Sequence, residues 1–243
     1  MEDTKPTPLL AVDNLNAWYG RSHILQGISF HVKAGEVVSL IGRNGAGKTT
    51  SMKSIMGLLG RTSGHAWFDG VDLLEKPAHE RFHHGLAFVF EERRIVPGLT
   101  VLENIELGVM ASPDGRKRTK AIVEEIAETF PRLKERLLQE AVTMSGGEQQ
   151  MLAIARAMAA SPKMIMLDEP SEGIMPKLVD EMFEYFEVLK KKGVTILLVE
   201  QSVEHALRIS DRAYIMDQGE IVHEAPAQVL LDDAEIQERY CSV

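Results

Sequence analysis

Apolar and polar positions alternate at the start of the chain. Residues 9–33 form two such runs on either side of Tyr19-Gly20-Arg21-Ser22. Alternation with a period of two is typical of half-buried strands, and a short polar stretch with glycine is typical of a turn. The pattern therefore predicts an opening layer of antiparallel strands. Near the other end, residues 213–216 and 220–223 flank Asp217-Gln218-Gly219, which is typical of a hairpin turn.

Four short runs elsewhere are almost continuously apolar. They are Val37–Ile41, residues 86–90, residues 164–167 and Thr195–Val199. Runs of this kind are typical of strands that are buried on both faces of a parallel sheet. Helical spacing lies between them, which predicts an α/β core.

The segments with helical spacing define a domain plan. Residues 49–59 follow the first buried run, and residues 122–130 and 148–159 are the clearest periodic segments. We therefore predict one domain with a helical subdomain inserted into the α/β core. The expected ranges are 9–243 for the domain, about 9–90 and 161–243 for the core, about 91–160 for the helical subdomain, and 1–8 for a flexible N-terminus.

Composition narrows the class of protein. A length of 243 residues with 44% hydrophobic content suffices for a core, and a net charge of -9 disfavours a nucleic-acid partner without excluding a local basic patch. The single cysteine, Cys241, cannot form an internal disulfide, which suits a reducing compartment. No apolar run approaches the roughly 18 residues of a membrane span. We expect a cytoplasmic chain that meets the membrane only through partners.

A glycine-rich loop follows the first buried run. Its sequence is Gly42-Arg43-Asn44-Gly45-Ala46-Gly47-Lys48-Thr49, followed by Thr50. Between a strand and a helix this pattern predicts a phosphate loop, the P-loop of NTPases, whose backbone N–H groups surround nucleotide phosphates. Lys48 would reach the β- and γ-phosphates, and the Thr49 hydroxyl would be a Mg²⁺ ligand. We predict that residues 42–50 contact ATP, whereas a mere glycine turn is disfavoured by this context.

A second buried run ends in two carboxylates, Asp168 and Glu169. We assign Asp168 to the metal and Glu169 to the attacking water. Paired acids at a strand end are often only helix caps or solvated loop residues. The neighbouring phosphate loop favours the catalytic interpretation.

A helix start at Ser145-Gly146-Gly147-Glu148 supplies a third motif. Backbone N–H groups at such a start bind anions. Here the sequence resembles the ABC ATPase family, whose signature reads Ser-Gly-Gly-Gln/Glu, although Met144 stands where leucine is common. The three motifs follow one another in the family's order and at its usual intervals.

The resemblance covers nearly the whole chain and implies the ABC-type fold: a RecA-like core, an N-terminal antiparallel β-subdomain and an inserted helical subdomain. It also implies a nucleotide-sandwich dimer, in which Ser145, Gly146 and Gly147 of one subunit face the γ-phosphate bound by the other. Ser145 and Lys48 thus join Glu169 in the catalytic set. Tyr19 matches the family's adenine-stacking aromatic, with a plain core tyrosine as the alternative.

Three positions depart from the common family pattern. Glu91 replaces a glutamine that touches Mg²⁺, Gln201 replaces a histidine that contacts the γ-phosphate, and Met175 replaces an aspartate of the dimer-contacting loop. A carboxylate can still bind Mg²⁺, and an amide can still donate a hydrogen bond. We therefore keep Glu91 among the metal ligands and Gln201 among the catalytic residues. The departures also leave open a weakened site.

The same departures resemble one branch, the F-type (LivF-like) ATPase of branched-chain amino-acid importers and related amide or urea importers. The resembling stretches are residues 90–101, 130–137, 145–156 and 197–201. The branch implies a sister ATPase (or a second copy), two membrane permeases and an extracytoplasmic solute-binding protein, at the cytoplasmic face of a prokaryotic inner membrane. If the sister keeps the ordinary residues, the two ATP sites would be unequal. The solute is not encoded in the motor.

Two other motifs are better explained as solvent-facing helix surface than as binding sites. His79-Glu80-Arg81-Phe82-His83 fits the zinc motif H-E-x-x-H, but no third ligand is near, and a solvent-facing helix is favoured. The basic run Arg116-Lys117-Arg118 with Lys120 is typical of a solvated helix face. Two rival functions remain: an ABC ATPase of translation, DNA maintenance or cofactor assembly, and a nucleotide-binding regulatory subunit with little hydrolysis. The first usually carries tandem domains, coiled coils or basic extensions, and retained Glu169 argues against the second.

Overall fold

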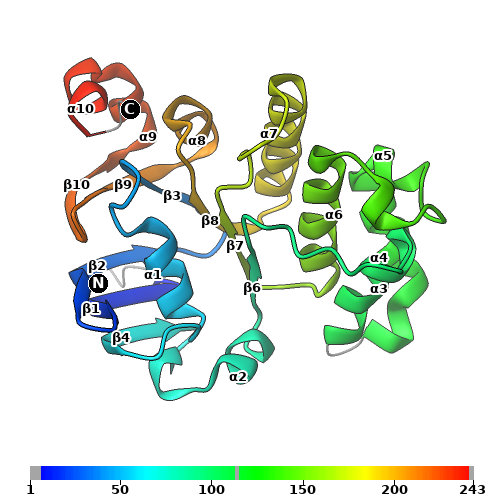
Figure 1. Cartoon of the computed structure of the whole chain (residues 1–243), viewed down its shortest axis with the longest axis horizontal. Coiled ribbons are helices and arrows are strands. Elements are labelled where there is room, and N and C mark those ends of the chain that lie inside the picture. The colour runs from blue at the N-terminus through cyan, green and yellow to red at the C-terminus, as the bar shows by residue number, and fades with distance from the viewer. Residues whose placement is uncertain (1–6, 113–114, 241–243) are drawn as a thin grey trace, which may run out of the picture.

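The computed structural model describes residues 7–112 and 115–240. The expectations for Cys241 and for residues 1–6 fall outside the described residues. Within them, strands of two sheets and helices alternate along the chain, which confirms the predicted α/β class (Figure 1).

The strands form two sheets. The first is antiparallel, in the order β2 (Ser22–Val32), β1 (Leu10–Tyr19), β4 (Thr62–Phe68) and β5 (Val71–Asp72). The second has the order β10 (Glu220–Pro226), β9 (Arg212–Asp217), β3 (Val37–Ile41), β8 (Thr195–Val199), β7 (Met164–Asp168) and β6 (Leu86–Val89). Its strands from β9 to β6 are parallel, and β10 pairs antiparallel with β9. All four buried runs expected in a parallel sheet are therefore confirmed.

The helices cover both sides of the second sheet and build a separate lobe. They are α1 (Lys48–Ile55), α2 (Ala78–His83), α3 (Val101–Ala111), α4 (Gly115–Thr129), α5 (Pro131–Lys134), α6 (Gly146–Ala159), α7 (Pro176–Lys191), α8 (Val203–Ile209), α9 (Ala227–Asp232) and α10 (Ala234–Tyr240). Helices α3 to α6 gather at one end of the molecule, away from β1, β2 and β4 (Figure 1). The exact domain boundaries near residues 90 and 161 stay a prediction.

The second sheet is buried on both faces because successive side chains of a strand point to opposite sides. Leu40, Met166 and Leu197 face α1 and the first sheet in one apolar cluster. Ile165 and Leu198, their neighbours along the strands, belong to the cluster that contains α6, α7, α8 and α9. This packing holds the carboxyl ends of β3, β7 and β8 together, and the loops that carry the candidate site follow those ends.

Some boundaries differ from the expectation. Helix α1 ends at Ile55 instead of residue 59, because Gly57 adopts φ +73, a left-handed conformation that closes the helix. Helix α4 runs from Gly115 to Thr129, so it carries the basic run expected on a helix face as well as most of the periodic segment 122–130. Strand β4 was not predicted, since only Ala66 and Phe68 of its seven residues are buried and the apolar alternation is therefore weak.

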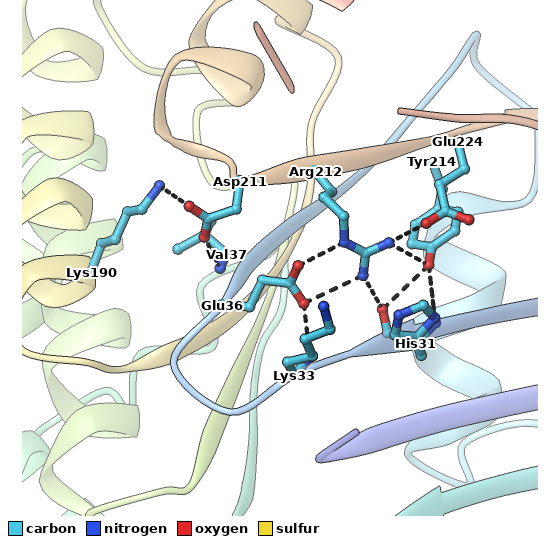
Figure 2. Close-up of polar contacts among 9 residues, drawn as sticks. All are labelled: His31, Lys33, Glu36, Val37, Lys190, Asp211, Arg212, Tyr214 and Glu224. Carbon is cyan, nitrogen blue, oxygen red and sulfur yellow. Dashed lines mark hydrogen bonds and ion pairs between the residues drawn. The ribbon is translucent and has the colours of Figure 1, made fainter. Parts of the chain in front are cut away.

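A polar cluster around Arg212, the first residue of β9, joins the two sheets (Figure 2). Arg212 of β9 donates from Nε to Glu36 Oε1 at 2.7 Å and from Nη2 to the His31 carbonyl of β2 at 2.9 Å, and it also pairs with Glu224 of β10. Burial opposes ionisation of Glu36, but hydrogen bonds from Arg212 and from the backbone of Lys33 outweigh it and lower the pKa of Glu36. The cluster thus anchors the first sheet to the core.

Candidate active site

The glycine-rich loop leaves β3 and leads into α1, as its sequence predicts. Gly42 has φ +147, and a Cβ there would lie 2.2 Å from the Met216 carbonyl oxygen. Gly47 has φ +107, and its added Cβ would lie 2.8 Å from the Leu25 side chain. Both positions require glycine, because a side chain would be strained and would collide. The loop therefore presents bare backbone beside the start of a helix, which suits an anion.

Lys48 supplies a buried positive charge inside this loop. Its side chain is 3% exposed, and Nζ donates to the carbonyl oxygens of Gly42 at 2.8 Å and Arg43 at 3.3 Å. Glu169 Oε1 lies 3.7 Å from the same Nζ. Burial lowers the pKa of Lys48, while the charges of Glu169 and Asp168 oppose the shift. The ammonium is thus held where a phosphate would neutralise it.

Thr49 and Asp168 meet at the end of β7. The Thr49 hydroxyl donates to Asp168 Oδ1 at 2.7 Å, and Asp168 is 1% exposed. Burial raises the pKa of Asp168 to about 6, although the Thr49 hydrogen bond and Lys53 oppose the shift. A hydroxyl and a buried carboxylate are hard oxygen donors of the kind Mg²⁺ prefers, so the pair fits the expected metal. Glu91 is exposed and acts on Asp168 through its charge.

Glu169 and Gln201 follow neighbouring strands and face each other. Glu169 has φ +46, and its N–H donates to the Val199 carbonyl at 2.8 Å. Its Oε2 accepts a hydrogen bond from Gln201 Nε2 at 2.5 Å. Parallel pairing of β7 with β8 places the two side chains together, although they are far apart in the sequence. The carboxylate is 12% exposed, so it reaches the edge of the loop.

A pocket of about 260 Å³ collects most of these groups. It is lined by Tyr19, Ile24, Gly45, Gly47, Lys48, Thr49, Thr50 and Glu169. Tyr19 is 49% exposed, so the alternative of a plain core tyrosine is wrong. The ring stands beside the phosphate loop, where a base could stack on it.

Ser145 begins α6 as its N-cap. Its N–H donates to Glu148 Oε2 at 2.9 Å and its hydroxyl oxygen accepts from the Glu148 N–H at 3.5 Å, which forms a capping box. The hydroxyl also donates to Glu148 Oε2 at 2.7 Å. Gly147 packs closely, since an added Cβ would lie 2.7 Å from Leu178. Helices α1 and α6 lie on different sides of the molecule (Figure 1). Among the described residues, Ser145 is not part of the lining of the pocket beside Lys48.

Sequence reasoning missed the residues that fix the loop after β6. Arg156 of α6 donates to the Arg93 carbonyl at 3.2 Å and to Asn104 Oδ1 at 3.3 Å, and Asn104 is fully buried. The Arg93 guanidinium lies against Gly146, where an added Cβ would be 3.0 Å from Nη1. The available signal was a charged residue, Arg156, inside the otherwise apolar run 151–160.

An apolar cavity of about 400 Å³ lies beside the same loop. Its walls come from β6, α3 and α6, and include Phe88, Phe90, Leu107, Gly108 and Ala153. Leu107 is 39% exposed and Met110, on the same helix, is 63% exposed. This groove is open to an apolar partner segment.

The histidine motif and the basic run both lie on helices. His79 and His83 are exposed on α2, and among the described residues no group of three His, Cys, Asp or Glu side chains could hold a metal. Lys117, Arg118 and Lys120 are exposed on α4, as predicted. In the part of the chain that the structure covers, every helix is too short or too polar to span a bilayer.

Comparison with known proteins identifies the family. The ABC transporter family model matches residues 25–172. The high-affinity branched-chain amino acid transport ATP-binding protein BraG of Pseudomonas aeruginosa is 40% identical over 96% of this chain and 99% of its own length. The probable branched-chain amino acid transport ATP-binding protein LivF of Archaeoglobus fulgidus is 35% identical over 92% of this chain and 94% of its own. Other similar proteins are named as the ribose import ATP-binding protein RbsA and the lipopolysaccharide export system ATP-binding protein LptB.

Solved structures agree. The ADP conformation of an ATP-binding cassette of an ABC transporter has a TM-score of 0.80 and 30% identity, covering 96% of this chain and 98% of that one. The fold, the loop geometry and the relatives lead to one family. The chain belongs to the ABC transporter ATP-binding proteins and resembles LivF.

Proposed function

We propose that this chain is the ATP-hydrolysing motor of an importer for branched-chain amino acids or related small amides. The observation that carries the proposal is the meeting of Lys48, the Thr49–Asp168 pair and the Glu169–Gln201 pair around one glycine loop. Helix caps or solvated loop acids would not account for a buried carboxylate bonded to the loop's own threonine.

The side chains divide the work by their chemistry. The loop backbone of residues 42–50 and Lys48 bind the phosphates, and Tyr19 stacks on the adenine. Thr49 and Asp168 would hold Mg²⁺, with Glu91 as a further candidate ligand, and the ion would neutralise charge on the phosphate oxygens. Glu169 accepts the proton of the attacking water. The Gln201 amide orients that carboxylate and can donate to the γ-phosphate, but it cannot carry a proton's charge as histidine would.

Two chains complete each site. The start of α6, with Ser145, Gly146 and Gly147, presents N–H groups to the γ-phosphate held by the second subunit. ATP closes the pair and hydrolysis reopens it. The second subunit is a sister ATPase or another copy of this chain.

Movement passes to the permeases through the apolar groove beside the loop after β6. This groove borders Phe90, and Arg156 anchors the loop at the Arg93 carbonyl, so a permease segment seated there would follow the helical lobe. We place the chain at the cytoplasmic face of a prokaryotic inner membrane, held by two permeases. The solute class rests on the names of BraG and LivF alone, since the solute meets a binding protein and the permeases.

The test is affinity purification of the tagged full chain from its native cells in mild detergent, with mass spectrometry of the retained proteins. Two hydrophobic permeases, a second ABC ATPase and solute-stimulated ATP turnover by the reconstituted complex are expected. Reproducible recovery of only ribosomal or assembly proteins would overturn the transporter role and leave the ATPase chemistry standing. Turnover stimulated by a sugar or a lipopolysaccharide instead would overturn the solute class alone.

A further inference from the structure

One buried carboxylate beside the site has no role so far. Glu200 directly follows β8 and is 1% exposed. Its Oε1 accepts from the Ser171 N–H at 2.9 Å, and its Oε2 accepts from the Ser171 hydroxyl at 2.8 Å, the Gln201 N–H at 3.1 Å and the Ser202 N–H at 3.4 Å. Three of these donors are backbone amides, which can only donate, so they require an acceptor with free lone pairs.

These bonds lie beside two contacts made by Glu169, the proposed catalytic base that is paired with Gln201. The Glu169 N–H is bonded to the Val199 carbonyl at 2.8 Å, and the Gln201 amide is bonded to the Glu169 carboxylate at 2.5 Å. Between these two contacts, the Glu200 side chain joins Ser171 to the backbone of Gln201. Glu200 therefore adds a further connection between the loops after β7 and β8, beside the two contacts made by Glu169.

Joining two loops through a buried carboxylate has an unfavourable desolvation free energy. Burying it opposes ionisation, and burial raises the pKa of Glu200 while hydrogen bonds from Ser171, Ser202 and Gln201 oppose the shift. Apolar packing would hold the loops together without this cost. Directional bonds to four donors instead fix the position of each loop, which is the property that a catalytic carboxylate needs.

We propose that Glu200 is a positioning residue for ATP hydrolysis, which sets the Gln201 amide against Glu169 and couples both to the segment that begins at Ser171. The buried side chain acts through Gln201 and Ser171. This inference rests on the catalytic roles proposed above for Glu169 and Gln201.

The test is Glu200→Gln in the full-length chain, alone and combined with Gln201→Ala. The variant keeps the shape of the side chain but turns an amide donor toward one of the existing donors. We expect kcat to fall about 10- to 100-fold, as for a small misplacement of a catalytic group, while ATP affinity stays unchanged. In the Gln201→Ala background the same change should cost little more, because the group that Glu200 positions is already gone. The matched control is Glu204→Gln, four residues on, whose carboxylate is 67% exposed.

A second readout does not depend on turnover. Amide hydrogen exchange should quicken at Ser171, Gln201 and Ser202 in Glu200→Gln, with the body of α8 still protected. If Glu200→Gln fails to fold, Ser171→Ala removes only the hydroxyl donor and should show the same lack of additivity with Gln201→Ala.

Three results would overturn the inference: unchanged kcat, a kcat loss that adds fully to that of Gln201→Ala, or a parallel loss of ATP affinity. Failure of the proposed catalytic site is separate, since Glu169→Gln would then leave turnover intact whatever Glu200 does.

Discussion

Replacement of Glu169 by glutamine tests the proposed catalytic base directly. The change removes one negative charge and keeps the shape of the side chain. A glutamine carbonyl can still accept the hydrogen bond that Gln201 donates to Oε2. It cannot take a proton from water, so the loss should fall on the chemical step.

The expected size follows from the role of the carboxylate. General base catalysis contributes about 10²- to 10⁴-fold, or about 3–5 kcal/mol of transition-state stabilisation. ATP affinity should hold or improve, because the carboxylate 3.7 Å from Lys48 also repels the phosphates that Lys48 attracts. We therefore expect a large fall in kcat with an unchanged or lower KM.

The assay is phosphate release over a range of ATP concentrations, together with a binding titration of ATP. Glu187→Gln on α7 is the control, since its side chain is 55% exposed and pairs with Lys191 on the same helix. A kcat within about tenfold of the wild-type value would refute the base assignment, which demands at least 10²-fold. In a complex with a different sister ATPase, partial loss is expected, and complete loss would count against unequal sites.

Three further predictions concern other parts of the molecule. Tyr19→Ala should weaken ATP binding about 5- to 100-fold through lost stacking, measured by titration, with Tyr19→Trp retaining affinity. Gly108→Ala should destabilise the chain by about 1–3 kcal/mol in denaturant unfolding, because the new Cβ would lie 1.9 Å from the Arg156 carbonyl. Arg212→Met should cost about 3–5 kcal/mol at neutral pH by leaving Glu36 buried without its partner.

The loss of unfolding free energy expected for Arg212→Met depends on pH. The pKa of Glu36 is lowered in the folded chain, so its contribution to stability is present above the unfolded pKa of about 4.3 and is lost as pH falls through the folded pKa. The difference in unfolding free energy between wild type and Arg212→Met should therefore shrink below about pH 4. A constant difference across that range would contradict the Arg212–Glu36 pairing. Equal ATP affinities of Tyr19→Ala and Tyr19→Trp would contradict the stacking role of Tyr19. An unchanged unfolding midpoint of Gly108→Ala would contradict the predicted clash with the Arg156 carbonyl.

The elements were predictable where the pattern was strong. Thr195–Val199 is almost continuously apolar and coincides with β8 at both ends. Strand β4 could not be predicted from the sequence, because its outer face carries Ser63, His65 and Trp67 and pairing with β1 decides its conformation. The end of α1 was not predicted correctly, because Gly57 lies inside a run with helical spacing.

The sequence by itself determined the chemistry at the candidate site. A glycine loop between a strand and a helix predicts a site for an anion, and two acids that follow a buried strand are expected at the end of that strand in the sheet. Lys48, Thr49, Asp168 and Glu169 could all be named from local pattern, because each follows directly from the element that carries it.

Only the tertiary structure decided which groups meet. The pairing of β7 with β8 brings Gln201 to Glu169 and turns Glu200 toward Ser171. Contacts of this kind depend on the register between strands that are distant in the chain, and one residue of slip would turn each side chain to the other face. Local sequence carries no record of that register, since it is set by the packing of the whole core.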